Sequence, residues 1–326
     1  MTRIDNQGNT KPSREYFRLW NPIKVEGGRK PAHDSNGSKE DFNIWTDSWF
    51  DWPMVVQSRM NGNWEDYNRL VTIQSAYCPL SCWHCYVEDE FKEAKTENSV
   101  YASAGEILEG FFEQKERDEQ NGEIDRVIRV SGGEPLLMPE MTLELLERLR
   151  SGGHDKEVFV WTDTNMIPLI RNDSGDLPIE DWINLDKLKE FRNFCLYPCF
   201  HGISPSNFTW ITGCDKRYFD GFFDVLALLI DKRIDFYPTF GSNVSKPADV
   251  EPFFNRLVDI NEKLPLRFAL IEYSLNYDPV IERVKREERP YVLYNKLLVI
   301  KRWNELLNSR YKKGYAEEPR HEVKLW

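Results

Sequence analysis

The stretch "YCPLSCWHCY", residues 77–86, places Cys78, Cys82 and Cys85 within eight residues and offers no fourth cysteine nearby. Three thiolates on one short loop can wrap a single metal centre, and thiolate ligands favour zinc or an iron-sulfur cluster. A structural zinc needs a fourth ligand, and the only local candidate, His84, adjoins Cys85, where neighbouring side chains rarely converge on one ion. A cubane with three ligated irons and one open iron does not need a fourth protein ligand. The spacing therefore predicts a metal centre with one position left for another molecule.

Outward from this loop, short apolar runs alternate with amphipathic segments, as in chains built from strand-helix units. The expected strands are residues 70–74, 126–130, 157–161, 194–200, 235–240 and 267–273. One helix is expected to begin after a cap at residue 103. The other expected helices lie near 141–151, 181–191, 219–230, 249–260 and 293–312. Strands separated by helical crossovers pair in parallel, in an open doubly wound sheet or a partial barrel.

The position of the polar motifs decides between these two architectures. The cysteine loop, "SGGEP" (131–135) and "TDTN" (162–165) all come directly after expected strands. In barrels, the chemistry lies at the carboxyl ends of the strands. We therefore expect an α/β fold, a partial (β/α)6 barrel of parallel strands with an N-terminal extension and a C-terminal helix.

A chain of 326 residues is long enough for about two domains or one barrel. We expect an N-terminal extension over 1–65, part loop and part docked cover, a core barrel over 66–275 and a C-terminal helical segment over 276–326. The cover is suggested by five of the eleven tryptophans, since residues this apolar are seldom left in water. These are Trp20, Trp45, Trp49, Trp52 and Trp64.

Charge and composition narrow the function classes. The chain has 43 Lys and Arg against 54 Asp and Glu, a formal net charge of -11, which disfavours a surface that tracks nucleic acid or anionic lipid. No apolar run is long enough to span a membrane, and the first residues lack the apolar core of a secretory signal. We expect a cytoplasmic protein without a membrane partner, whose six cysteines serve metal or redox chemistry rather than disulfides.

The C-x3-C-x2-C spacing of the cysteine loop resembles the signature of the radical S-adenosylmethionine (SAM) superfamily. The resemblance covers roughly residues 70–275 and is closest to the branch of pyruvate formate-lyase activating enzymes and wyosine synthases. It implies that Cys78, Cys82 and Cys85 ligate a [4Fe-4S] cluster whose open iron binds SAM. Reductive cleavage of SAM then yields a 5'-deoxyadenosyl radical. His84 stands where the family has an aromatic residue near the adenine.

Three further motifs match the family's contacts to SAM. By resemblance, Gly132, Gly133 and Glu134 of "SGGEP" hold the methionine amine, since glycines admit close approach and a carboxylate accepts from an ammonium group.

The other two motifs lie later in the chain. Thr164 and Asn165 of "TDTN" resemble the stretch that contacts the ribose or carboxylate of SAM, although both could simply cap a turn. His201, in "FHGISPSNFTWITGCDKRYF" (200–219), holds a position where relatives contact SAM.

The remaining cysteines leave two interpretations open. Cys195 and Cys199 share strand parity with His201, and with Cys214, in a segment expected to start a helix, they could hold an auxiliary cluster. They could equally be core residues, since buried cysteines are common.

The sequence thus indicates a radical SAM enzyme that abstracts a hydrogen atom from an unidentified substrate, in an activase-like or small-molecule reaction. No catalytic side chain can be assigned. The expected partners are an electron donor such as a flavodoxin or ferredoxin and a small-molecule or protein substrate rather than tRNA.

Two alternatives stay open. One is a wyosine-like tRNA-modifying radical SAM enzyme, because residues 283–313 hold ten Lys and Arg and three Glu. The other is a zinc-stabilised, non-enzymatic interaction protein.

Overall fold

The computed structural model describes most of the chain from residue 69 onward and short segments before it. The described residues are 3–4, 10–11, 17–20, 43–45, 52–60, 62–63, 67, 69–92, 99–171, 175–176, 179, 184–243, 246–271, 275, 278–285, 288–312 and 320–326. Of the five tryptophans of the expected N-terminal cover, Trp49 and Trp64 lie outside these residues, and only the backbone is described for the other three. The cover and the expected domain limits therefore stay predictions.

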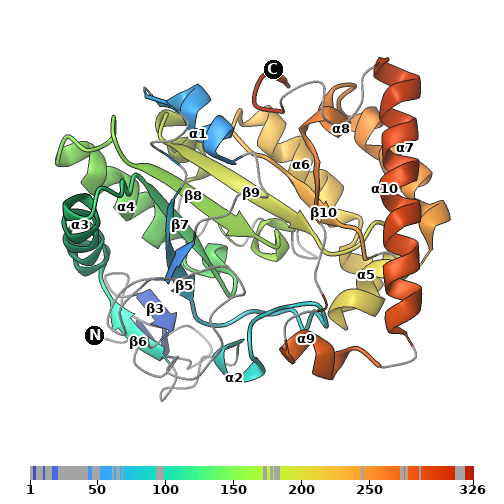
Figure 1. Ribbon diagram of the computed structural model, residues 1–326, viewed down its shortest axis with the longest axis horizontal. Coiled ribbons are helices and arrows are strands. Elements are labelled where there is room, and N and C mark those ends of the chain that lie inside the picture. The colour runs from blue at the N-terminus through green and yellow to red at the C-terminus, as the bar shows by residue number, and fades with distance from the viewer. Residues whose placement is uncertain are drawn as a thin grey trace. The chain divides into compact units, whose positions relative to one another are not determined.

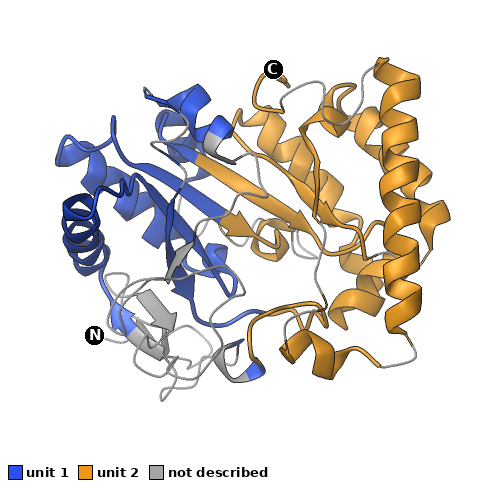
Figure 2. Cartoon of the chain, in the orientation of Figure 1, with its two compact units in different colours: residues 1–78, 89–162, 181–194 blue, residues 79–88, 163–180, 195–326 orange. Residues whose placement is uncertain are grey.

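The chain forms two compact units, coloured separately in Figure 2. Unit 1 comprises residues 1–78, 89–162 and 181–194, and unit 2 comprises 79–88, 163–180 and 195–326. The boundary falls inside the cysteine loop: Cys78 ends the first segment of unit 1, while Cys82 and Cys85 belong to unit 2.

Unit 1 is built on parallel strands. β5 (Leu70–Ser75) pairs with β7 (Val127–Gly132), and β7 pairs with β8 (Phe159–Thr164). Strands β3 (Phe17–Trp20), β4 (Asn43–Trp45) and β6 (Ser99–Ala102) add antiparallel pairs, and β1 (Arg3–Ile4) pairs with β2 (Thr10–Lys11). All six residues of β5 are buried, as expected for a strand inside a parallel sheet.

The helices of unit 1 start where the sequence indicates. α3 (Ala104–Gln120) begins with a capping box in which Glu106 N donates to Ser103 Oγ and Ser103 N donates to Glu106 Oε2. α4 (Pro139–Ser151) ends at the predicted Gly152. The other helices are α1 (Trp52–Arg59), α2 (Asp89–Lys92), η4 (Pro135–Leu137) and η7 (Leu185–Glu190). Figure 1 shows α3 and α4 beside the strands of this unit.

Unit 2 continues the strand-helix rhythm with β9 (Phe194–Phe200), β10 (Thr239–Gly241) and β11 (Ala269–Ile271), which pair in parallel. The helices are α5 (Pro205–Thr212), α6 (Gly221–Asp231), α7 (Val250–Ile260), α8 (Leu264–Arg267), α9 (Asp278–Arg283) and α10 (Arg289–Tyr311). Unit 2 also contains the 3-10 turns η5 (Ile167–Leu169), η8 (Lys216–Tyr218) and η9 (Pro247–Asp249).

An aromatic cluster forms the core of unit 2. Phe200 from β9 packs edge-on against Phe222, Phe223 and Phe253, and Phe240 from β10 packs against Trp303 with ring centroids 4.8 Å apart. Edge-to-face packing of this kind adds to the stabilisation from buried area. Through these rings and the contact of Phe253 with Trp303, the cluster joins α6, α7 and α10 to the strands, and Figure 1 shows α7 beside α10.

The predicted fold class is confirmed: the structure is α/β, with parallel strands each followed by helix, and its sheet does not close among the described residues. All six expected strands occur, but β10 begins later than predicted. Pro238 lacks a backbone N–H, so residues 235–238 form only an isolated bridge between Leu196 and Phe236.

Two helix predictions were wrong. The segment expected as an α-helix near 181–191 contains the 3-10 helix η7, started by the Asn184 side chain, which accepts from Asp186 N, and ended only three residues before β9. Cys214 does not start a helix but follows α5, which ends at Gly213 in the left-handed conformation. Within the described residues, no helix is both long and apolar enough to cross a membrane.

A buried charge network joins the start of β5 to the end of α3 in unit 1. Arg69 Nε contacts Asp125 Oδ1 at 2.8 Å, its Nη2 contacts Asp118 Oδ2 at 2.7 Å, and its Nη1 contacts Glu123. Burial and the hydrogen bond with Asp118 raise the pKa of Asp125 to about 7. One proton is therefore retained on this carboxyl in the folded chain at pH values where the unfolded chain has lost it.

We predict that the loss of this proton at higher pH makes unit 1 less stable. The pKa of Asp125 is higher in the folded chain, so its protonated carboxyl contributes fully to the free energy of unfolding below the pKa of the unfolded chain, near 4. This contribution is lost as the pH rises towards 7, with a slope of at most about 1.4 kcal/mol per pH unit. Thermal unfolding from pH 5 to 8 should show this decline in the wild type and a flatter profile in Asp125→Asn, which mimics the protonated acid. Parallel profiles for the two proteins would contradict the assignment.

Candidate functional site

The glycine motif after β7 lies against the chain that leads into the cysteine loop. In unit 1, Gly133 N donates to Ser75 O at 2.7 Å and Glu134 N donates to Tyr77 O at 2.8 Å. A Cβ on Gly133 would stand 1.9 Å from Tyr77 O, and one on Gly132, which has φ +94°, would stand 2.7 Å from Gln74 Oε1. The glycines are therefore required by the approach of two backbone segments. Sequence reasoning attributed them only to a ligand.

This turn also fits a polar ligand. Gln74 Oε1 and Ser75 Oγ are buried at the end of β5 and have no hydrogen-bond partner among the described residues. Buried acceptors without partners are unusual in native proteins and are well matched by an ammonium group. Glu134 is fully buried, and its Oε1 accepts from Leu136 N at 2.9 Å, which starts η4. The carboxylate therefore has a structural role in addition to the predicted contact with the methionine amine.

The remainder of the cysteine loop is anchored within unit 2 by its main chain. Ser81 N donates to Thr212 O at 3.1 Å and Trp83 N donates to Ile211 O at 3.0 Å. These acceptors are carbonyls of the last turn of α5, which have no partner inside a helix. The loop thus completes the end of α5, a helix that the sequence analysis missed although Ser204, Pro205 and Gly213 are typical cap signals.

Arg283, from α9, holds the far side of the same loop. Its Nη1 donates to Cys85 O at 2.6 Å and its Nη2 donates to Val87 O at 2.7 Å. Two charge-assisted hydrogen bonds from one planar group fix both position and orientation. No sequence pattern indicated this contact, because the partners are almost 200 residues apart and a single arginine in a basic segment gives no local signal.

Cys82 is buried, and Cys78 and Cys85 are half-buried. Closely spaced cysteines on an anchored loop fit the ligand set of an iron-sulfur cluster. Cys78 N donates to Lys92 O, which anchors the first cysteine in unit 1. The predicted ligand residues thus lie on one continuous stretch of chain whose backbone is held at both ends.

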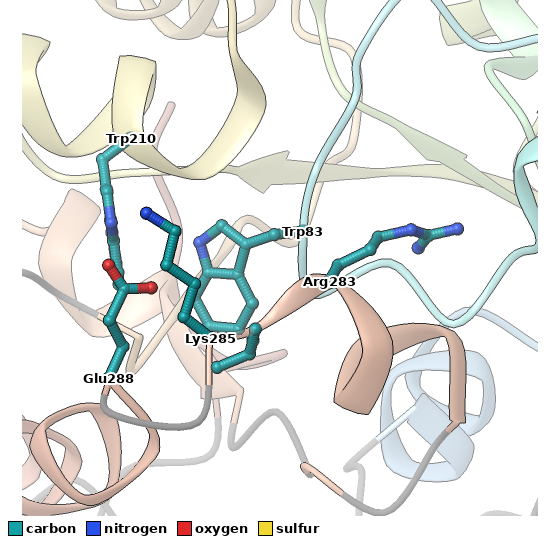
Figure 3. A pocket seen from close by; sticks show the side chains of 6 residues that line it. Trp83, Trp210, Arg283, Lys285 and Glu288 are labelled. Carbon is teal, nitrogen blue, oxygen red and sulfur yellow. The ribbon is translucent and has the colours of Figure 1, made fainter.

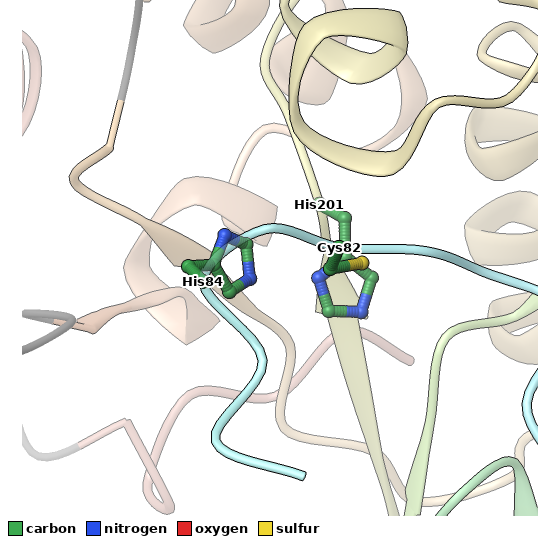
Figure 4. Close-up of side chains that lie close together, drawn as sticks. All are labelled: Cys82, His84 and His201. Atoms are coloured by element: carbon green, nitrogen blue, oxygen red, sulfur yellow. The ribbon is translucent and has the colours of Figure 1, made fainter. Parts of the chain in front are cut away.

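Two histidines lie beside Cys82 in unit 2. His84 stacks on His201 with ring centroids 5.5 Å apart, and the ligand atoms of Cys82, His84 and His201 lie within 4.8 Å of one another (Figure 4). Burial lowers the pKa of His201 to about 4 and, with the charges of His201 and Arg283, lowers that of His84 well below its usual value. Neutral imidazoles beside a thiol could also hold zinc, a set that sequence reasoning missed because it considered His84 only with Cys85.

Thr164 and Asn165 cap the turn into η5. Thr164 Oγ1 accepts from Met166 N at 2.9 Å, and Asn165 Oδ1 accepts from Ile167 N at 3.0 Å. Both side chains are buried. Their capping role is the plainer of the two roles weighed from the sequence, and their contact with SAM stays a prediction.

The other cysteines do not assemble. Cys195 is fully buried in β9, Thr239 Oγ1 donates to Cys199 Sγ at 3.5 Å, and Cys214 Sγ lies 3.9 Å from Pro79 O. Burial raises the pKa of the Cys214 thiol. Among the described residues, none of these three cysteines belongs to a group that could hold a single metal ion, and the auxiliary cluster stays a prediction.

A cavity of about 250 Å³ opens beside the cysteine loop in unit 2 (Figure 3). Trp83, between Cys82 and Cys85, forms one wall, and its ring meets that of Trp210 edge-on with centroids 5.2 Å apart. Lys285 and Glu288 complete the polar part of the lining. Trp83, an aromatic residue of the cysteine loop, therefore borders this cavity.

One family of known proteins matches part of the chain. Residues 68–180 match the family of 4Fe-4S single cluster domains, a segment that contains the cysteine loop, the glycine motif and "TDTN". A search of curated proteins finds no match. The family match supports the predicted [4Fe-4S] cluster at the cysteine loop, and the radical SAM class with SAM as a second cofactor stays a prediction.

Three solved structures show a limited similarity to this chain. SuiB of Streptococcus suis, bound to the precursor peptide SuiA, has a TM-score of 0.48 at 14% identity, over 74% of this chain and 46% of that one. The protein anSMEcpe with bound AdoMet has a TM-score of 0.47 at 17% identity, over 74% and 62%. A radical SAM methyltransferase from Sphaerobacter thermophilus has a TM-score of 0.41 at 15% identity, over 69% and 63%. This chain thus spans less than two thirds of each.

We predict that Gly133→Ala prevents stable cluster loading. Its Cβ would collide with the rigid Tyr77 carbonyl and displace the chain that enters Cys78. Iron and sulfide content after anaerobic reconstitution should fall severalfold. Gly105→Ala in α3 is the matched control, because its Cβ meets only side chains, those of Arg148 at 3.4 Å and Ser103 at 3.7 Å. Normal loading of Gly133→Ala would show that the contact does not matter.

We also predict that Arg283→Met loosens the cysteine loop, because the carbonyls of Cys85 and Val87 lose their donors. The reconstituted cluster should lose iron to a chelator several times faster than in the wild type. Arg302→Met, which removes only exposed ion pairs with Glu251 and Glu305, should lose iron at the wild-type rate. Equal rates of iron loss for both variants would show that Arg283 does not stabilise the cysteine loop.

Proposed function

We propose that this protein is a radical SAM enzyme that reductively cleaves SAM and abstracts a hydrogen atom from a small molecule or protein substrate in the cytoplasm. The observation that supports this most is the main-chain contact that holds Gly133 and Glu134 against Tyr77, directly before Cys78. It brings the predicted site for the methionine amine next to the first predicted cluster ligand. A cluster held by these cysteines would supply the one electron needed for the reductive cleavage of SAM.

The roles of this chain's own residues follow from their contacts. Cys78, Cys82 and Cys85 would ligate the cluster, while Arg283 and the end of α5 fix the loop that carries two of these cysteines. Glu134 would accept hydrogen bonds from the amine of SAM, and the unpartnered Gln74 Oε1 lies beside the same turn.

The electron must come from a partner, and we propose a one-electron carrier such as a flavodoxin or ferredoxin. Trp83 supports an approach near the cysteine loop, since it lies between two predicted cluster ligands and lines the cavity of Figure 3. Lys285 adds a positive charge at the cavity, and an acidic carrier would be attracted to it.

The zinc-binding alternative rests on one specific observation, the set of Cys82, His84 and His201. It would make the site structural rather than catalytic. Metal analysis of protein purified without oxygen separates the two: iron with sulfide supports the enzyme, and one zinc without sulfide supports the alternative.

We predict that anaerobically reconstituted protein forms 5'-deoxyadenosine from SAM in the presence of dithionite, and that Cys82→Ala forms none. Glu134→Gln should retain iron and thermal stability, because its amide oxygen can still accept from Leu136 N, but bind SAM at least tenfold more weakly. Equilibrium binding of SAM to the cluster-loaded variants gives this number. Unchanged SAM affinity in Glu134→Gln would contradict the assigned role, and absence of 5'-deoxyadenosine from the wild type would contradict the function.

A further inference from the structure

The cavity of Figure 3 is bordered by a buried hydrogen-bond donor that is not used within unit 2. Trp83 forms one wall, and its indole Nε1 is buried without a hydrogen-bond partner among the described residues. Figure 3 shows this nitrogen on the edge of the ring that is turned towards Lys285 and Trp210. An indole N–H can only donate, and a buried donor without an acceptor is destabilising. Its presence in a folded protein therefore requires an explanation.

The walls of the cavity are fixed by contacts of their own. Trp83 N donates to Ile211 O at 3.0 Å, so the cysteine loop is attached to α5 directly after Trp210. The two indole rings meet at 61° with centroids 5.2 Å apart. On the opposite side, Arg283 donates to the carbonyls of Cys85 and Val87. The cavity is therefore enclosed by anchored segments of the cysteine loop, α5 and α9.

Two side chains of opposite charge line the same cavity. Lys285 follows α9 and Glu288 precedes α10, and Glu288 N donates to Lys285 O at 3.0 Å. Among the residues that the structure describes, neither side chain forms an ion pair. An ammonium group and a carboxylate that share a cavity without pairing complement a ligand that carries both charges.

The aromatic walls and the size of the cavity limit the rest of the ligand. The faces of Trp83 and Trp210 favour an apolar side chain and also attract an ammonium group. The volume is about 250 Å³, below the roughly 300–1,000 Å³ of most pockets for drug-sized ligands. A molecule with both charges, an apolar part and this small size has the composition of a free amino acid.

We propose that this cavity binds a small zwitterion, a free α-amino acid with an apolar side chain. Its carboxylate accepts from Trp83 Nε1 and Lys285, its ammonium group donates to Glu288, and its side chain packs against the two indoles. The site uses none of the residues predicted to contact SAM. A bound amino acid joins the cysteine loop to the segment between α9 and α10, and so stabilises the loop that Arg283 also holds.

The first test is calorimetric titration of cluster-loaded, SAM-free full-length protein with each of the common L-amino acids. At least one with an apolar side chain should bind with a Kd of about 1 mM or lower. The amine and the carboxylic acid with the same side chain, which each lack one charge, should bind about tenfold more weakly or worse. For leucine these probes are 3-methylbutylamine and 4-methylpentanoate. Absence of binding by every amino acid, or equal binding of either analogue, would overturn the proposal.

Variants then locate the bound amino acid. Lys285→Met and Glu288→Gln should each weaken binding about tenfold, because each removes one charge from the cavity. Trp83→Phe, which keeps an aromatic wall and removes the N–H group, should weaken it severalfold. The matched controls are Lys301→Met and Glu305→Gln, the same replacements at exposed positions of α10, and they should bind as the wild type does. Binding that survives both cavity variants lies elsewhere, for example at an open iron, and contradicts the proposal.

The link to the cysteine loop has its own measurement. The amino acid that binds should slow the loss of iron to a chelator severalfold in the wild type and leave the rate unchanged in Lys285→Met. Equal rates with and without the amino acid in the wild type would show that the cavity does not stabilise the loop. Neither measurement uses SAM or radical chemistry, so this proposal can fail while the proposed function stands.

Discussion

The main-chain contact between the turn after β7 and the end of β5 determines how the chain enters the cysteine loop. Tyr77 has φ +78°, a conformation that costs energy in a residue with a side chain, and its carbonyl accepts from Glu134 N at 2.8 Å. Only glycine at position 133 permits this approach. The predicted methionine-binding motif and the first predicted cluster ligand therefore depend on each other for their position.

Within unit 2, the backbone of the rest of the loop is held by hydrogen bonds, either to other backbone groups or from an arginine side chain. The carbonyls at the end of α5 accept from Ser81 and Trp83, and Arg283 donates to the carbonyls of Cys85 and Val87. A loop anchored in this way needs no secondary structure of its own. Its conformation can therefore be set before any metal is bound, which is what a preorganised ligand set requires.

The sequence predicted the fold class, the six strands and the motif pair because each leaves a local pattern. Alternating apolar runs mark strands, the Ser103 capping box marks α3, and the glycine motif follows a strand directly. It did not predict Arg283, the stacking of His201 on His84 or the unpartnered indole nitrogen of Trp83. These features depend on contacts between distant residues and on which buried groups lack partners, and neither quantity has a local signal. The late start of β10 did have a local signal in the sequence, Pro238, but the apolar pattern of residues 235–240 concealed it.

The central claim is that three cysteines bind a cluster with one iron left for SAM. Electron-nuclear double resonance on the reduced, cluster-loaded protein tests it directly, with SAM labelled by magnetic isotopes of nitrogen and oxygen at its amino and carboxylate groups. The account predicts hyperfine coupling of both labels to the cluster, because methionine's own atoms complete the coordination of the open iron. Coupling of neither label in protein that binds SAM, or a fourth ligand from the protein on every iron, would contradict it.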